Sequence, residues 1–132
     1  MRFQFTKGVS HILALILLLT LSCKKETIEV SVDAFSQLNT EVKSEQGVYQ
    51  ILFTLQSYPY SEVGVRISKS KDSFYKNTGL GNFYANKVSP ERYGTFINGL
   101  DRKTTYYYQI YVKDSSGPKE VHSDVYSFQT IP

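Results

Sequence analysis

From Thr27 onward, apolar and polar residues alternate over short stretches, and turn-forming residues separate one stretch from the next. Alternation with a period of two places successive side chains on opposite faces of a β-strand. We expect six such strands, with a seventh near Asn82–Val88. The six ranges are Ile28–Val32, Val48–Leu55, Val63–Ile67, Arg92–Ile97, Thr104–Lys113 and Val121–Thr130. Many short strands in a chain of 132 residues predict one all-β domain, an antiparallel β-sandwich.

The stretch Asp33–Glu45 does not follow this pattern clearly. Ala34, Leu38 and Val42 recur at helical spacing, so a short helix is one interpretation. The apolar support for a helix is thin, because an isolated helix of this length is marginal without a packed face. We therefore favour a loop or an irregular strand.

The strand Thr104–Lys113 allows its two faces to be assigned. Gln109 and Lys113 share one face, and both carry polar groups that are costly to bury without partners. The opposite face, which holds Tyr106 and Ile110, should therefore point into the core. We expect Phe53 and Ile110 at the core centre.

The first 22 residues have the organisation of an export signal. Arg2 and Lys7 precede an apolar run of ten residues, and the small residue Ser22 ends the segment. The run is shorter than the ~20 apolar residues that a spanning helix needs, which argues against an uncleaved membrane anchor. We therefore expect residues 1–22 to be a signal peptide.

Cys23 follows this segment directly, and it is the only cysteine of the chain. The sequence Thr20-Leu21-Ser22-Cys23 resembles the lipobox of bacterial lipoproteins, in which the cysteine carries diacylglycerol and becomes the first mature residue. The resemblance implies lipidation at Cys23, a membrane contact through that anchor, and residence in the cell envelope. An inner-membrane retention signal usually has Asp at the position of Lys24. The resemblance therefore also implies sorting to the outer membrane. An ordinary signal peptide followed by a free cysteine is the alternative.

These observations predict three parts: a signal peptide (1–22), a lipidated tether (23–27) and a β-sandwich (28–132). The whole chain has 15 basic and 12 acidic residues. The signal and tether account for four basic residues and one acidic residue, so the predicted sandwich has 11 of each. A neutral domain lacks the electrostatic pattern of a nucleic-acid-binding protein.

A family resemblance appears at the turn before the strongest strand. Leu100, Thr104 and Tyr106 have the spacing of the tyrosine corner in fibronectin type III domains, and the resemblance covers about Ile28 to Pro132. It implies a seven-stranded fibronectin type III-like sandwich within the immunoglobulin-like class. It also implies a structural role for Tyr106, whose buried hydroxyl needs a backbone partner. The chain departs from the family in having no tryptophan.

Residue patterns for catalysis and metal binding are scarce in the sequence. His122 is the only histidine beyond the signal segment, and no Gly-x-Ser-x-Gly motif is present. A zinc site needs three or four ligands, and this histidine with the carboxylates of the chain has no recognisable ligand spacing. The sequence also has no calcium-loop pattern. We therefore expect no catalytic residues, no metal site and no cofactor, and we read His122 as a solvated strand residue.

Aromatic residues provide the candidate binding surface. Tyr58 and Tyr60 are expected in a loop, while Tyr107 and Tyr111 should face outward with Arg66 on a neighbouring strand. Further aromatic pairs, Phe74-Tyr75 and Phe83-Tyr84, lie in the segment between the strands Val63–Ile67 and Arg92–Ile97. Tyrosine is rigid and enriched at recognition surfaces, although half-buried tyrosines on an outer sheet face are also ordinary.

The sequence therefore predicts a non-catalytic, lipid-anchored envelope module that binds an unidentified protein or glycan or acts as a scaffold. An accessory carbohydrate-binding lipoprotein is the first alternative. A hydrolase is the second, and the missing catalytic patterns argue against it. A spacer without a ligand is the third.

Overall fold

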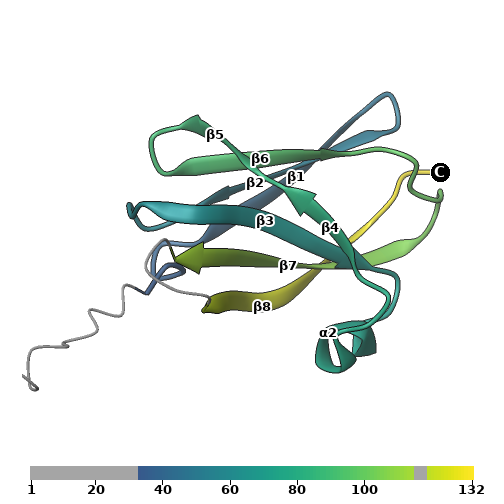
Figure 1. The fold of residues 1–132 in the computed structure, drawn as a ribbon. Coiled ribbons are helices and arrows are strands. Elements are labelled where there is room, and N and C mark those ends of the chain that lie inside the picture. Colours follow the sequence, from purple (N-terminus) through teal and green to yellow (C-terminus); the bar gives the residue numbers. More distant parts are fainter. Residues whose placement is uncertain (1–32, 115–118) are drawn as a thin grey trace, which may run out of the picture. The chain divides into compact units, whose positions relative to one another are not determined.

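A computed structural model describes residues 33–114 and 119–132. Within these residues the chain forms eight strands and one short helix (Figure 1). In chain order they are β1 (Asn39–Glu45), β2 (Val48–Thr54), β3 (Tyr60–Ser68), α2 (Asp72–Lys76), β4 (Gly81–Tyr84), β5 (Asn86–Ser89), β6 (Arg92–Ile97), β7 (Thr105–Asp114) and β8 (Glu120–Gln129). The helix within these two ranges lacks the length and apolar content that a membrane crossing requires.

The strands form two four-stranded sheets, with the orders β1-β2-β6-β5 and β4-β3-β7-β8. Every strand pair is antiparallel. The two sheets lie face to face, one above the other in Figure 1. The predicted all-β antiparallel sandwich is therefore confirmed.

The ambiguous stretch at the start of the domain contains a regular strand. β1 pairs with β2 over all seven of its residues, from Asn39 opposite Thr54 to Glu45 opposite Val48. The loop between them is Gln46-Gly47, with φ of 51° and 79°. Positive φ at both positions is the pattern of a type I′ hairpin turn, which matches the twist of paired strands. The preference for a loop or irregular strand was wrong for Asn39–Glu45, because this hairpin supplies pairing that helical spacing cannot reveal.

The stretch predicted as one seventh strand is two strands in two different sheets. β4 pairs with β3 and β5 pairs with β6, and only Ala85 lies between them. Figure 1 shows the chain passing here from the lower sheet to the upper one. The backbone N–H of Ala85 donates to the carbonyl oxygen of Val63 (2.9 Å), so the crossover stays attached to β3.

Other boundaries differ in smaller ways. β3 begins at Tyr60, so this residue belongs to a strand and not to the preceding loop. The strand expected at Ile28–Val32 lies outside the described residues.

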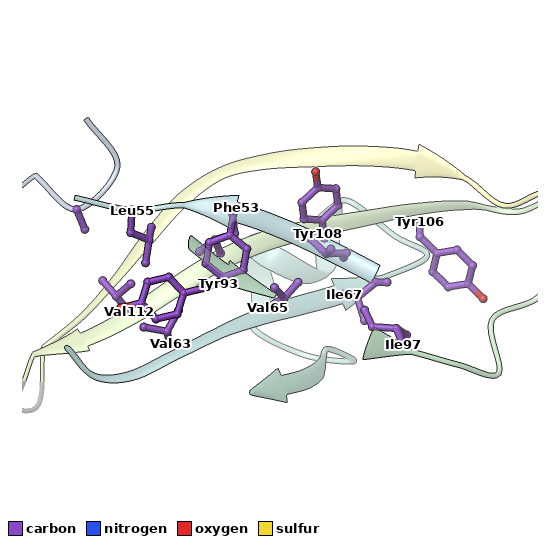
Figure 2. Packing of buried hydrophobic residues seen from close by; sticks show 13 residues of the cluster. Phe53, Leu55, Val63, Val65, Ile67, Tyr93, Ile97, Tyr106, Tyr108 and Val112 are labelled. Carbon is purple, nitrogen blue, oxygen red and sulfur yellow. The ribbon is translucent and has the colours of Figure 1, made fainter. Parts of the chain in front are cut away.

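The core lies between the sheets and has the predicted centre. Phe53 and Ile110 are fully buried, and so are Ile51, Leu55, Val65 and Ile97. Figure 2 shows Leu55 and Val63 at one end of this core and Ile97 and Tyr106 at the other. The predicted inward face of β7 is confirmed, because its members are at most 6% exposed: Tyr106, Tyr108, Ile110 and Val112.

Candidate functional site

The side of the β4-β3-β7-β8 sheet that faces away from the core is called the outer face here. Three predicted surface residues, Arg66, Tyr107 and Tyr111, come together on it. The register of β3 and β7 explains this, since Ser68 pairs with Tyr107 and Gly64 with Tyr111. Residues at every second position of two paired strands share one face of the sheet.

Tyr111 points outward as predicted, but it is only 2% exposed. Its ring lies against Gly64, where an added Cβ would be 2.5 Å from the ring carbon Cζ. Only glycine permits such a close approach. The hydroxyl donates to Oε1 of Glu62 (2.9 Å). Tyr111 therefore faces outward without being exposed, because glycine on the neighbouring strand lets the ring lie flat.

Arg66 covers the Tyr111 ring. Its guanidinium carbon is 4.7 Å from the ring centroid, a cation–π distance. The same guanidinium forms an ion pair with Glu120, contacts Nε2 of His122 (3.2 Å) and donates from Nε to Oδ1 of Asn82 (3.2 Å). Its side chain is 13% exposed. Four neighbours thus fix the Arg66 head group in one position.

His122 therefore belongs to a polar cluster and is not simply solvated. Besides Arg66, its Nε2 lies 2.8 Å from Oε1 of Glu120. Alternation counted back from Tyr126 would put His122 on the inner face, but a β-bulge reverses this parity, because the pairing of β7 with β8 shifts between Gln109 and Tyr111. The side chain of Ser123 occupies the bulge, where its hydroxyl accepts from the N–H of Ile110 (2.9 Å).

Glu62 connects Tyr111 to a second cation. Its Oε2 accepts from Nζ of Lys113 (3.2 Å). The hydrogen bond from Tyr111 is the main cause that lowers the pKa of the Glu62 carboxyl, and Lys113 adds to it. Burial, with the Glu62 hydrogen bond second, raises the pKa of Tyr111. The pair is thus a carboxylate and a neutral phenol at neutral pH. Two cations, Arg66 and Lys113, face two carboxylates, so the charges within this cluster balance.

Tyr84 is the most exposed aromatic residue of this face. It pairs with Gly64 on β3 and is 70% exposed. Tyr107, further along β7 on the same face, is half-buried. The sequence identified Tyr84 as a surface aromatic but could not place it beside Tyr111. That placement depends on the register between β3 and β4, which the sequence does not reveal.

A pocket of about 250 Å³ opens beside this face, between the start of β3 and the β4–β5 crossover. Three tyrosines from three strands contribute to it. Its lining consists of Tyr60, Ser61, Glu62, Val63, Tyr84, Ala85 and Tyr93.

Tyr58 and Tyr60, both predicted surface residues, lie next to each other but have different contacts. Their ring centroids are 5.2 Å apart. The Tyr58 hydroxyl contacts both carboxylate oxygens of Asp114 (3.0 and 3.1 Å), which ties the loop before β3 to the end of β7. Tyr60 lines the pocket and donates to the carbonyl oxygen of Gln56 (2.7 Å). Desolvation by burial, aided by nearby Tyr93, raises the pKa of Tyr60 to about 12.

The predicted tyrosine corner lies at the start of β7. The backbone N–H of Asp101 donates to the Tyr106 hydroxyl (2.9 Å), which supplies the expected backbone partner. Thr104 donates its N–H to the Thr130 hydroxyl (2.9 Å), and Leu100 packs against the core. These three residues hold the corner together. Cys23, the predicted lipidation site, lies outside the described residues.

The described residues contain no group of three or more His, Cys, Asp or Glu side chains that could hold a metal ion. The outer face instead offers a stacking ring, Tyr84, and hydrogen-bonding groups in fixed positions, among them Asn82 and Arg66. A few well-placed polar groups beside an apolar surface are what small-ligand recognition requires.

No protein-family model and no curated protein matches the sequence. Among solved structures, the chain is similar to BhCBM56, a carbohydrate-binding module determined as a bromine derivative. The TM-score is 0.50 and the sequence identity 12%, over 70% of this chain and 90% of the other. At this identity the similarity concerns the fold alone.

Proposed function

We propose that this chain is a lipid-anchored, non-catalytic module of the bacterial cell envelope that binds neutral glycans on its outer face. The observation that carries the proposal is the exposed ring of Tyr84 beside a charge-balanced cluster with a fixed arrangement. An aromatic ring can stack on the apolar face of a sugar, while neighbouring polar groups bind its hydroxyls.

The charge balance decides between glycan classes. Arg66 is occupied by Glu120, and Lys113 by Glu62. An acidic polysaccharide would have to compete with these carboxylates for the cations, whereas a neutral sugar needs only hydrogen bonds. Asn82 and Gln109 provide amide groups for such bonds. Gln109 donates to the carbonyl oxygen of Ser123 (2.8 Å), and the second N–H and the amide oxygen add further capacity.

The likeness to a carbohydrate-binding module supports the proposal only through architecture. A β-sandwich carries many unrelated functions, so the assignment rests on the residues of this chain. The strand order β4-β3-β7-β8 and the hydrogen bond between Asp101 and Tyr106 support a fibronectin type III-like sandwich. β5 adds an edge strand to the opposite sheet.

The envelope location rests on the lipobox resemblance at Cys23. Mass spectrometry of the exported protein should find diacylglycerol on this residue, and Cys23→Ser should release the protein from membranes. Recovery of an unmodified thiol in the exported protein would reject the anchor and would leave the binding proposal intact.

Binding is tested with the full chain in detergent micelles and a panel of neutral hexasaccharides, with polygalacturonate as the acidic comparison. We expect at least one neutral hexasaccharide to bind and Tyr84→Ala to weaken that binding about tenfold, roughly 1.4 kcal/mol. Tyr75→Ala is the matched control, because Tyr75 is 77% exposed on α2. Binding of polygalacturonate alone, or equal losses in the two variants, would contradict the proposal.

A further inference from the structure

The pocket beside the outer face shares two residues with the proposed glycan site. Glu62 and Tyr84 line the pocket and also belong to that face. On β7, the positions from Tyr107 to Lys113 span roughly 20 Å at about 3.4 Å per residue. A glycan lying along the outer face would therefore reach the pocket at the Glu62 end.

The size of the pocket limits what can enter it. Its volume of about 250 Å³ is below the ~300–1,000 Å³ of sites that enclose drug-sized ligands. A single sugar ring suits this space, whereas a segment of several residues does not.

The lining has the chemistry of a site for a hydroxylated ring. Tyr60, Tyr84 and Tyr93 supply apolar ring surface. In the Glu62 carboxylate, Oε1 accepts one hydrogen bond from Tyr111 and Oε2 accepts one from Lys113. An ionised carboxylate has about four acceptor positions, so roughly two remain for ligand hydroxyls. The lowered pKa of Glu62 keeps these acceptors ionised at neutral pH.

Aromatic rings around a carboxylate also suit an organic cation, but two lysines oppose that interpretation. Nζ of Lys113 is already paired with Glu62. Nζ of Lys87 lies 5.8 Å from the centroid of the Tyr93 ring. A ligand cation would be repelled by the ammonium group of Lys113 at the carboxylate and by that of Lys87 at the Tyr93 ring. A neutral sugar carries no charge and is not repelled by either.

We infer that this pocket binds the terminal sugar residue of a glycan whose following residues lie over Tyr84 toward Tyr107. The inference rests on the proposed function and adds to it that the module recognises chain ends. The amount of protein bound should then depend on the number of glycan chain ends and not on the mass of polymer.

The test compares one hexasaccharide, the tightest binder of the neutral panel, in three forms: unmodified, reduced to the alditol at one end, and methylated on the hydroxyls of the other terminal residue. The full chain should bind one end-modified form at least tenfold more weakly than the unmodified sugar. The modification of the other end should have little effect.

Ser61→Leu connects this discrimination to the pocket. Ser61 is exposed and lines the pocket, so a leucine there adds bulk without entering the core. In this variant the unmodified and end-modified sugars should bind with equal, reduced affinity. Ser44→Leu, at an exposed position of β1 in the other sheet, should discriminate like the wild type. Melting temperatures of both variants verify that they fold.

Each outcome separates the two proposals. Equal binding of all three sugar forms by the wild type would overturn the terminal-residue inference and retain glycan binding. Unchanged discrimination in a folded Ser61→Leu would also overturn the inference. Displacement of the sugar by millimolar choline chloride would show that the pocket takes an organic cation and would overturn the terminal-residue inference. Failure of every hexasaccharide in the panel to bind would remove the proposed function itself.

Discussion

Each face of β7 buries one tyrosine almost completely, Tyr108 on the inner face and Tyr111 on the outer face, but in different ways. On the inner face, Tyr108 is 3% exposed and contacts Tyr126 and Phe128, with ring centroids 5.6 and 5.9 Å away. On the outer face, Tyr111 is 2% exposed. Its cover consists of the guanidinium of Arg66 above the ring and the backbone of Gly64 below it.

The comparison shows that low exposure does not by itself identify a core residue. The inner tyrosines stabilise the fold through apolar packing between two sheets. The outer tyrosine is enclosed by polar and charged groups, and its hydroxyl fixes the Glu62 carboxylate. The outer arrangement therefore prepares a surface, whereas the inner one holds the sandwich together. Substitutions on the two faces of β7 should differ accordingly.

The largest effect is expected on the inner face. Ile110→Ala should lower the free energy of unfolding by about 2–5 kcal/mol, because it leaves a cavity at a fully buried position. Urea unfolding of the full chain measures this change. Val121→Ala, at a position 51% exposed on β8, should cost about 0.5 kcal/mol or less. Comparable losses in the two variants would contradict the assigned core centre.

The second effect concerns the close approach on the outer face. Gly64→Ala places a Cβ 2.5 Å from the Tyr111 ring, and the resulting overpacking should cost about 1–3 kcal/mol. Gly94→Ala is the matched control in the other sheet. Its Cβ would be 2.8 Å from Cδ2 of Leu52, the end of a flexible side chain, so its cost should be smaller. Urea unfolding that ranks the two variants in reverse would show that the Tyr111 ring moves freely.

The third effect isolates one hydroxyl on the inner face. Tyr106→Phe removes the acceptor of the Asp101 N–H, and we expect a loss of about 1–2 kcal/mol. Tyr107→Phe, on the outer face of the same strand, is the control. Thermal unfolding should show a clearly larger shift for Tyr106→Phe. Equal shifts would argue that the corner hydrogen bond contributes nothing to stability.

Alternation predicted the sandwich, and alternation together with side-chain polarity predicted the inner face of β7. The requirement that Gln109 and Lys113 keep polar partners assigned the face correctly, and burial of Phe53 and Ile110 followed from the same period. A backbone partner for the Tyr106 hydroxyl could also be predicted, because Asp101 is only five residues away and the spacing is local information.

The outer face could be predicted only in part, because it depends on contacts between strands. Arg66 and Tyr107 were placed on it by parity. The burial of Tyr111 depends on the pairing of Gly64 with that position, and the exposure of Tyr84 depends on the register of a four-residue strand. Neither register has a local signal. The crossover at Ala85 likewise divides a continuous β-prone stretch between two sheets. The pocket beside this crossover therefore could not be predicted from the sequence.

The smallest effect sharpens the comparison through pH. The pKa of Glu62 is lowered in the folded chain, so this group contributes stability that is present above its unfolded pKa. The contribution is lost as the pH falls through the lower folded pKa, which places the window below about pH 4.5. Glu62→Gln cannot titrate, so its melting temperature should fall less steeply than that of the wild type between pH 5 and pH 3. Partial exposure of the Glu62 side chain (27%) keeps the difference small. Glu45→Gln, at an exposed position of β1, should follow the wild-type curve. If Glu62→Gln follows it equally closely, the carboxylate on the outer face is not held by Tyr111, and the outer face is less ordered than the inner one.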